Sequence, residues 1–431
     1  MKKLLIAVFL LTGVCTNVTF SQKFEKKIAA SDKSIADPKK GANPKTWISR
    51  GELFYEIANA PTSDLVVGMD EATYNTVMAT SGIDEKVTAT TEKIGEETFT
   101  VHNFSDKKIY FTKGIIMFWD IFKYEVTDPF QKSYESYAKA KSLDTENKNS
   151  KKLSVNMKQL ATFAKSEAFN KYHLNKYAEA VTLFKLALDC FSDPLVNEVD
   201  SLLYYFTGVI AGEIEDYATA EKYLRKAIEI GYTENGDAYA SLGKALTAAG
   251  KSDEGRAVLE KGITVNPENQ QLIFNLINNY MATGKDPKDI IPLIDKAIEK
   301  EPNNASLYSV EGQLYDKIGD AENAAKYFKK AIEIDSTYFF GYYGLGILYF
   351  NTGAKYSEQA TNEKDNTEYE RLLKLSDEQL KLALPYLEKS FQLNSSEKSI
   401  LQALKDINFR FRNENDTYKQ NAEKYTKLLE E

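Results

Sequence analysis

The sequence predicts an all-α fold in which helix–turn–helix repeats form a stack, with a small β-containing insertion near the N-terminus and a helical cap at the C-terminus. The main observation is a repeat period close to 34 residues, a length typical of a two-helix repeat. The period is interrupted near both ends, and an amphipathic stretch follows it. The clearest copy of the repeat contains Tyr239, Leu242, Gly243, Leu246, Gly250, Gly255, Leu259, Gly262 and Pro267. Arrays of this kind present extended binding surfaces.

Length and charge narrow the class of protein. A chain of 431 residues would ordinarily form two or three domains, but stacked repeats grow linearly and need not divide. The net charge is -8, and acidic and basic residues are interspersed, which indicates a solvated surface. Nucleic-acid binding requires concentrated Lys and Arg, so we expect no nucleic-acid partner.

Residues 1–21 have the pattern of a signal peptide for export. A basic start precedes the apolar run Leu4–Val14, which is too short to span a membrane. Small and polar residues follow, and we expect cleavage before Gln22. Residues 22–43 are expected to form an N-terminal linker. No later segment is predicted to cross a membrane.

The two cysteines offer little chemistry. A lipid-modified Cys15 would need a small residue just before it and usually Leu three residues before it, but Val14 and Thr12 occupy those places. Once Cys15 is removed with the signal, Cys190 is the remaining thiol, so no intramolecular disulfide can form. Cys190 lies in an apolar stretch and is expected to pack as a small hydrophobic residue.

The first repeat spans 44–147 and is interrupted. Its second helix is expected at Phe130–Leu143, which leaves an insertion at 56–127. Within the insertion, Thr98–Phe104 and Lys108–Thr112 carry β-branched and aromatic residues around a polar tripeptide. This pattern favours a β-hairpin.

A contiguous array of about five repeats is expected over 148–338. In the clearest copy, large residues share one face of the first helix, and the small Gly243 lets the second helix approach closely. Gly250 ends the first helix in a turn that tolerates positive φ, and Pro267 stops the second. One such hairpin cannot bury its own apolar face, so neighbouring repeats must stack.

The last repeat spans 339–396 and is also interrupted. Its first helix is expected at Phe339–Phe350 and its partner at Leu380–Leu393, with a polar insertion at 354–378 between them. Residues 397–431 are expected to form one long or two short amphipathic helices. These helices would cap the stack, because terminal repeats need a polar outer face.

The helix Phe339–Phe350 is apolar on every side, as buried helices normally are. Its core face contains Tyr342, Leu345, Gly346 and Tyr349, and its second face contains Phe340, Tyr343, Ile347 and Phe350. The second face is either an exposed anchor for a partner or is covered by the chain itself. We favour internal cover, by 354–378 or by the C-terminal helices.

No catalytic, cofactor-binding or metal-binding residues are predicted. Gly250-Lys251-Ser252 copies the end of a phosphate-binding loop, but it follows a helix instead of a strand and lacks the earlier glycine. Gly341-x-x-Gly344-x-Gly346 reverses the dinucleotide spacing and lies within a helical pattern. Two distant histidines and one cysteine cannot furnish a typical zinc site. Paired-carboxylate catalysis stays open, although nothing points to a particular pair.

The repeat resembles the tetratricopeptide repeat (TPR) family. That family has a large residue at repeat position 4, a small one at 8, Tyr at 11, small residues at 20 and 27, and Pro at 32. The block at Ala305 matches with Tyr308, Gly312, Tyr315, Ala324, Phe328 and Ala331, and the block at Ser201 with Tyr204, Gly208, Ala220, Leu224 and Ala227. The resemblance covers about 160–340 and implies a right-handed superhelical stack, here of a bacterial exported type.

The resemblance further implies a concave groove lined by the first helices, with repeat positions 2, 5, 9 and 12 facing it and position 6 at its edge. These positions include Tyr205, Lys244, Phe274, Asn275, Asn278, Ser306, Ser309, Gln313, Phe340 and Tyr343. Amides such as those of Asn275 and Asn278 offer a donor and an acceptor together, so they could pair with an extended peptide backbone. The alternative is that they are merely solvated.

One TPR subfamily grips a terminal carboxylate through three successive first helices, which supply Lys and Asn, then Asn, then Lys and Arg. Asn275 could serve as the middle Asn. The flanking places hold Ala240 and Lys244 on one side and Ser306 and Val310 on the other. We therefore expect no clamp of that type.

Three functions are compatible with these observations. The leading one is a non-catalytic exported scaffold, in the periplasm, at the outer membrane or outside the cell, that binds a protein or peptide on the concave surface. The second is a glycan-binding outer-membrane or cell-surface protein, which exposed aromatic residues in the insertion, notably Trp119, would support. The third is a cell-envelope enzyme whose site lies in 56–127, which converging polar side chains there would favour.

Overall fold

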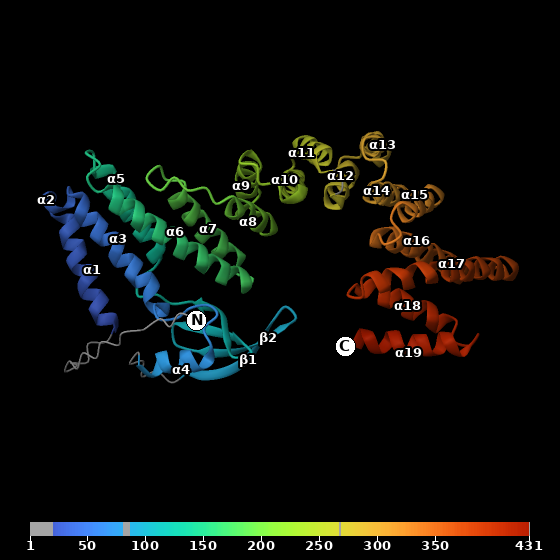
Figure 1. Ribbon diagram of the computed structural model, residues 1–431, viewed down its shortest axis with the longest axis horizontal. Helices are drawn as coiled ribbons and strands as arrows, with labels where there is room; N and C mark the ends of the chain where they lie inside the picture. The colour runs from blue at the N-terminus through green and yellow to red at the C-terminus, as the bar shows by residue number, and fades with distance from the viewer. Residues whose placement is uncertain (1–19, 81–86, 267–268, 431) are drawn as a thin grey trace, which may run out of the picture. The chain divides into compact units, whose positions relative to one another are not determined.

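The computed structural model describes residues 20–80, 87–266 and 269–430, with side chains from residue 24 onward. Within these residues the chain forms nineteen α-helices and one four-stranded sheet, which confirms the predicted helical stack with a small β-containing insertion (Figure 1). It divides into two compact units, 1–219 and 220–431. The predicted signal peptide, except its last two residues, lies outside the described residues. None of the helices that the structure describes is both long and apolar enough to cross a membrane.

Helices occupy the stretch 22–43, where the sequence suggested a linker. They are α1 (Phe20–Ala36) and α2 (Pro38–Gly41), and they precede α3 (Pro44–Asn59). Phe24 of α1 is buried in a cluster with three residues of α3, namely Leu53, Phe54 and Ile57. The apolar residues of α1 share one face among many lysines and serines, so its low overall hydrophobicity concealed an amphipathic helix.

A repeat pair forms between α3 and α5 (Pro129–Leu143), although the insertion separates them in sequence. The Tyr137 ring lies against Gly51, where an added Cβ would come within 2.3 Å of the ring. Ser133 donates from Oγ to the Gly51 carbonyl oxygen at 2.9 Å. The small residue in the first helix thus admits the second helix at close range, as a two-helix repeat requires.

The insertion contains a helix and a sheet where the sequence indicated a hairpin. The elements are α4 (Glu71–Thr80), β1 (Thr88–Ile94), β2 (Glu97–Asn103), β3 (Lys107–Thr112) and β4 (Ile115–Ile121). The strands follow the order β1-β2-β3-β4, and every neighbouring pair is antiparallel. The hairpin that the sequence indicated is β2–β3, in which His102 pairs with Ile109.

Both faces of the sheet carry buried apolar residues. One face packs with Tyr74 of α4 and includes Phe104, Ile109, Phe111, Ile116, Trp119 and Ile121. The other face includes Phe99, Val101, Tyr110 and Phe118 and contacts Leu174, which caps α6 (Ser150–His173). The sheet therefore has its own apolar core and contacts the C-terminal end of α6 through Leu174.

A buried polar cluster joins β4 to α6. Trp119 donates from Nε1 to Glu167 Oε1 at 2.5 Å. Lys171 and Lys176 each donate to one oxygen of Asp120, both at 2.7 Å. Asp120 is thereby paired with cations, whereas Glu167 accepts hydrogen bonds from neutral donors. Burial raises the pKa of Glu167 to about 7.

Beyond α6, the first unit continues through α7 (Tyr177–Phe191) and α8 (Ser201–Glu213), and α9 (Tyr217–Glu229) crosses into the second unit. The next three helix pairs are α10 (Asp237–Ala248) with α11 (Ser252–Val265), α12 (Gln270–Ala282) with α13 (Ile291–Lys300), and α14 (Ala305–Lys317) with α15 (Ala321–Ile334). Gly243 meets Leu259, and Gly312 meets Phe328. Gly250 has a φ of +80°, as the turn after α10 requires.

Helix fills most of the stretch 354–378, where a polar insertion was expected. The last repeat consists of α16 (Phe339–Asn362) and α17 (Asn366–Leu393), which form a long hairpin (Figure 1). Gly353 packs on Leu380, and Ser376 donates to the Gly353 carbonyl oxygen at 2.8 Å. Strong helix formers continue both helices past the end of the repeat pattern, because polar composition by itself does not end a helix.

The chain closes with α18 (Lys398–Arg410) and α19 (Asp416–Glu430). Their buried residues share one cluster with those of α17, including Leu387, Leu404 and Tyr425. Part of the second face of α16 packs against this cluster through Tyr343, Ile347 and Phe350. Of the two covers that the sequence suggested for this face, the C-terminal helices supply it.

Candidate functional site

The predicted groove residues lie on the first helices of the repeats. In the second unit these helices are α10, α12, α14 and α16, and each contacts the next. We call their shared outer surface the first-helix face. Lys244, Phe274 and Asn278 are exposed on it, and Gln313 is half-buried. Tyr205 lies on α8 in the first unit and is considered separately.

Phe274 is the most exposed aromatic residue of this set. Its side chain is 46% exposed on α12, although the neighbouring Leu272, Ile273 and Leu276 are buried. Asn278, one turn further along the same helix, is also exposed. An apolar ring held in water beside an exposed amide matches the surface that a bound chain would need.

Asn275 is part of the scaffold and does not offer its amide to a ligand. It is 8% exposed, donates from Nδ2 to the Ala240 carbonyl oxygen at 2.9 Å, and accepts from Gln271 at 2.8 Å. Asn279 is likewise buried, and it donates to Thr247 at 2.8 Å and to the Ser252 carbonyl oxygen at 2.9 Å. These amides join α12 to the preceding helix pair. Only Asn278 of the three stays available for peptide pairing.

Tyr338 covers the part of the face contributed by α14. Ser306 and Ser309, which the resemblance placed in the groove, are buried. The Tyr338 hydroxyl accepts a hydrogen bond from Gln270 Nε2 at 2.8 Å and lies beside both serines. Burial raises the pKa of Tyr338. The residue that fills this position comes from the loop before α16, so the spacing of repeat positions could not reveal it.

An aromatic cluster begins at Tyr338 and continues into α16. Phe340 is 40% exposed, and its ring lies 5.9 Å from Tyr338 and 5.0 Å from Phe339. Tyr343 stacks on Phe339 at 5.5 Å, and its hydroxyl lies 3.3 Å from Ser399 Oγ of α18. Cover by α18 therefore leaves Phe340 as the exposed member of the cluster.

Glu311 is a buried carboxyl at a position where other first helices have leucine. Leu242, Leu276 and Leu345 occupy the equivalent places. Glu311 is fully buried in α14, and its burial, followed by the nearby Asp295 carboxylate, raises its pKa to about 7, while Tyr327 opposes the shift. The carboxyl lies inside the repeat core, not on the first-helix face.

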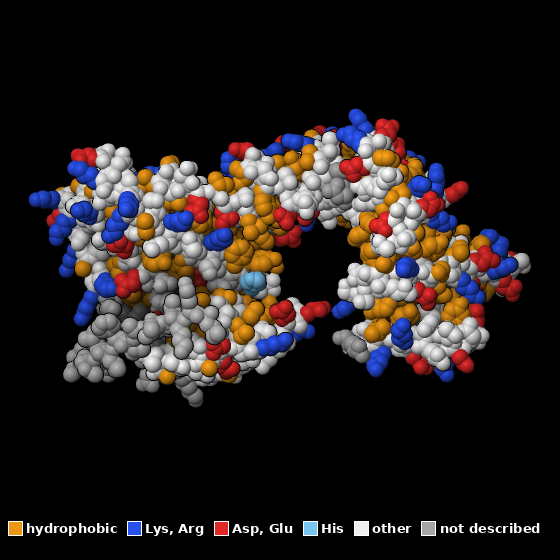
Figure 2. Space-filling view, viewed as in Figure 1, with side chains coloured by type: hydrophobic (Ala, Val, Ile, Leu, Met, Phe, Trp, Pro, Cys, Tyr) orange, Lys and Arg blue, Asp and Glu red, His pale blue; other side chains and the backbone are white. Residues whose placement is uncertain are grey.

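The first unit carries a second aromatic surface, of which only Tyr205 was predicted from the sequence. Phe206 of α8 lies 5.8 Å from Tyr205, 5.8 Å from Phe169 and 6.4 Å from Tyr172. These four residues, all half-buried, form what we call the aromatic shelf. Figure 2 shows hydrophobic side chains gathered beside a histidine on this unit. The available signal was the spacing of Phe169 and Tyr172 on one face of α6.

Residues that could suggest a reactive thiol, a phosphate-binding loop or a glycan-binding surface are buried or paired with other side chains. Cys190 is buried, and burial raises the pKa of its thiol. Lys251 of the loop-like Gly250-Lys251-Ser252 pairs with Glu221 at 2.7 Å. Trp119 is 5% exposed, so it does not offer the surface that the glycan hypothesis needs. Within the described residues, no three His, Cys, Asp or Glu side chains are grouped to hold a metal ion.

Three segments of the chain match the model of a known repeat family. The family model for the tetratricopeptide repeat matches residues 202–230, 236–269 and 305–338. A TPR repeat-containing protein from Methanocaldococcus jannaschii is 24% identical over 254 residues, which are 48% of this chain and 44% of that protein. Anaphase-promoting complex subunit 3 from Schizosaccharomyces pombe is 22% identical over 168 residues, 39% of this chain and 25% of that protein. The chain thus spans less than half the length of these relatives.

Among solved structures, a TPR repeats protein from Bacteroides fragilis is similar to this chain at 24% sequence identity. The similarity covers 57% of this chain and 97% of that protein, with a TM-score of 0.24.

Proposed function

We propose, from the premise that this chain is a tetratricopeptide-repeat protein, that it is an interaction scaffold whose first-helix face binds a peptide segment of a protein partner. Tetratricopeptide-repeat proteins are generally protein–protein interaction scaffolds. The observation that carries the proposal here is the exposure of Phe274 and Phe340, which are the most exposed aromatic residues on the first helices α12 and α16. Large aromatic anchors supply much of the binding energy at protein interfaces.

The face also offers polar groups for a bound backbone. Asn278 is exposed on α12 between Phe274 and the end of the helix, and Gln313 is half-buried on α14. Tyr338 closes the α14 section between the two aromatic anchors. A peptide bound here would place one apolar side chain against Phe274 and another against Phe340, and would cross Tyr338 between them.

Crosslinking with mass spectrometry in the native host tests the proposal. The double change Phe274→Ala and Phe340→Ala should remove specific partners that the wild-type protein captures. Leu382→Ala is the matched control, because Leu382 is 48% exposed but lies on the second helix α17. Identical partner sets for the double variant and the wild type would rule out the first-helix face.

Export is a second part of the proposal, supported by the basic start and the apolar run Leu4–Val14. The mature protein should begin at Gln22 and should be recovered from the cell envelope or the medium. Intact-mass measurement of the protein from its own host would show this cleavage, and a mass that includes residues 1–21 would contradict it.

A further inference from the structure

A cleft lies between α1 and α3 in the first unit, with α2 at one end, and none of the predicted groove residues line it. It has a volume of about 680 Å³ and is open to solvent. Small-molecule sites commonly fall between about 300 and 1,000 Å³. The cleft is therefore large enough for a ligand bigger than a single inorganic ion.

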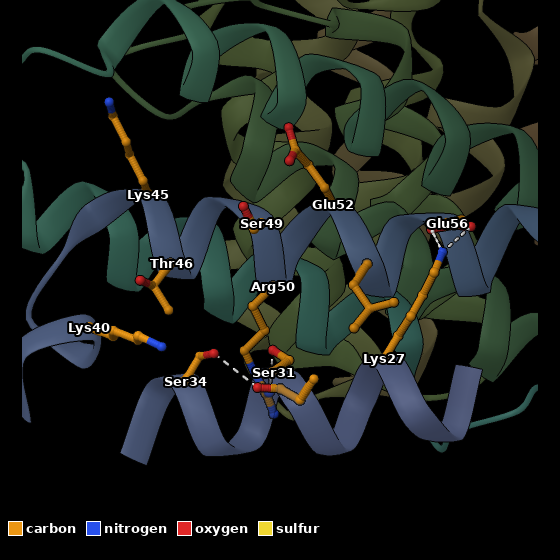
Figure 3. A pocket seen from close by; sticks show the side chains of 12 residues that line it. Lys27, Ser31, Ser34, Lys40, Lys45, Thr46, Ser49, Arg50, Glu52 and Glu56 are labelled. Atoms are coloured by element: carbon orange, nitrogen blue, oxygen red, sulfur yellow. Dashed lines mark hydrogen bonds and ion pairs between the residues drawn. The ribbon is translucent and has the colours of Figure 1, made fainter. Parts of the chain in front are cut away.

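Figure 3 shows which side chains face this cleft. Lys40 extends from α2 into the gap, and Ser34 of α1 and Thr46 of α3 point toward the same space. Arg50 crosses from α3 to α1. Lys45, which also lines the cleft, leaves α3 on the side away from α1. Three separate elements thus direct polar groups to one place.

The acidic side chains around the cleft already have cationic partners. Lys27 donates to both oxygens of Glu56 at 2.8 Å, and Arg50 donates to Asp32 at 2.7 Å and to Ser31 Oγ at 2.9 Å. Within the part of the chain that the structure describes, Lys40 forms no ion pair, and the Thr46 hydroxyl forms no hydrogen bond. The charge of Lys40 is therefore not compensated by a nearby carboxylate.

The sequence around the cleft is basic in an otherwise acidic chain. The stretch 23–50 contains Lys23, Lys26, Lys27, Lys33, Lys39, Lys40, Lys45 and Arg50, against Glu25, Asp32 and Asp37. The whole chain has a net charge of -8. In Figure 2, Lys and Arg side chains gather on the part of the first unit where Figure 1 shows α1 to α3. Such a region attracts anions before any specific contact forms.

We propose that this cleft binds a phosphate ester. The Lys40 ammonium and the Thr46 hydroxyl supply donors for the phosphate oxygens, and Lys40 supplies the uncompensated positive charge. Ser34 donates to the Ala30 carbonyl oxygen at 2.9 Å, which leaves its own oxygen to accept from a ligand hydroxyl. The chemistry that fits is a phosphate carried on a small polyol.

Two sources provide this chemistry, namely a soluble phosphate ester such as glycerol 3-phosphate and the headgroup of phosphatidylglycerol. Both present a phosphate next to hydroxyl groups, and both fit the volume of the cleft. The experiment distinguishes them by measuring binding of the full chain to soluble glycerol 3-phosphate by calorimetry, and to vesicles of phosphatidylglycerol or phosphatidylcholine by co-sedimentation.

Lys40→Gln and Lys39→Gln are the matched variants. They remove the same charge from adjacent residues of α2, but of the two only Lys40 lines the cleft. Lys40→Gln should weaken binding at least tenfold, whereas Lys39→Gln should change it less than twofold. Both side chains are exposed, so circular dichroism should show unchanged folding. Thr46→Val should weaken binding severalfold without altering net charge.

The outcomes decide both the site and the source. Binding of glycerol 3-phosphate that depends on Lys40 supports a soluble ligand, and Lys40-dependent binding of phosphatidylglycerol vesicles, but not phosphatidylcholine vesicles, supports a headgroup. Equal losses in the two lysine variants would mean diffuse attraction to a basic surface and would overturn the proposal. No binding to any of the probes would overturn it as well.

Discussion

The two places where the repeat period breaks contain different kinds of structure. Between α3 and α5 the chain folds into a helix and a four-stranded sheet with apolar residues buried on both faces. Between the repeat portions of α16 and α17 the chain only prolongs the two helices to a short connection. A break in the repeat period therefore shows that residues are inserted there, but it does not show how those residues fold. Composition distinguishes the two, because aromatic and β-branched residues fill the first break and helix formers fill the second.

The two breaks also differ in how they are attached. The sheet is joined to α6 by the buried Asp120–Lys171 pair and by the Trp119–Glu167 hydrogen bond, and the half-buried Lys176 beyond α6 is a second partner of Asp120. The hairpin extension is held by contacts such as Gly353 on Leu380. We therefore expect changes at the sheet joint to cost much more stability than changes in the extension.

The largest effect should follow from Lys171→Met. This change leaves Asp120 buried with one cationic partner fewer, and breaking a buried pair typically costs about 3–5 kcal/mol. Urea unfolding followed by tryptophan fluorescence measures the loss, because Trp119 lies in the joint. Lys158→Met is the control on the same helix, since its exposed pair with Glu198 should contribute less than about 1 kcal/mol. Similar losses in both variants would contradict the account.

The next effect concerns pH and Glu167. Its pKa is raised to about 7 by burial, so the folded state holds a proton that the unfolded chain releases near pH 4.5. The stability that this group contributes is fully present below pH 4.5 and is lost as pH rises through 7, a change of about 3 kcal/mol. Glu167→Gln should flatten this dependence in unfolding measured between pH 5 and 8. The groups facing Glu167 are Trp119, Asn170, Lys171 and Asp120.

Glu311 provides the corresponding measurement in the second unit. Glu311→Leu introduces the residue found at the equivalent place in α10, α12 and α16 and should remove the pH dependence of that unit. Hydrogen exchange resolved by peptide can follow the two units separately. If neither variant changes the slope of stability against pH, burial of these carboxyls does not control their protonation.

A smaller effect tests whether both interrupted repeats keep the same helix contact. An added Cβ at Gly51 would lie 2.3 Å from the Tyr137 ring, and one at Gly346 would lie 2.8 Å from the Leu387 side chain and 3.1 Å from its backbone nitrogen. Gly51→Ala should cost about 3 kcal/mol and Gly346→Ala about 2 kcal/mol, because the approach to the ring is closer. Thermal unfolding would measure both losses of stability. A larger loss for Gly346→Ala than for Gly51→Ala would contradict this expectation.

The smallest effect should come from shortening the hairpin. Removal of 355–361 together with 367–373 takes two turns from each helix and should cost no more than about 2 kcal/mol. Dye binding to exposed apolar surface should stay unchanged, because α18 covers Tyr343, Ile347 and Phe350. Removal of 398–430 should increase dye binding. An increase after the hairpin deletion would show that the extension provides cover.

The parts of the fold that the sequence predicted are those set by local spacing. Gly243 and Gly312 stand where a second helix must approach, and Gly250 stands where the backbone requires positive φ. The parts that it missed depend on contacts between distant segments. Phe24 of α1, for example, is buried against Leu53, Phe54 and Ile57 of α3.

The candidate site shows the same limit. Phe274 and Phe340 are exposed on the first-helix face, as the repeat positions suggested. Asn275 occupies a groove-edge position but bonds to the Ala240 carbonyl oxygen of another helix. Tyr338 enters the face from a loop that no repeat position describes. Position within a repeat indicates a face, whereas the neighbours decide whether a side chain is free to bind.

The most direct test of the central claim is photocrosslinking in the cell with a photoreactive phenylalanine placed at 274, at 340 or at 382. We expect covalent adducts with the same partner proteins from positions 274 and 340 and none of these adducts from position 382. Adducts from 382 alone, or different partners from 274 and 340, would contradict the claim that the first-helix face is the binding surface.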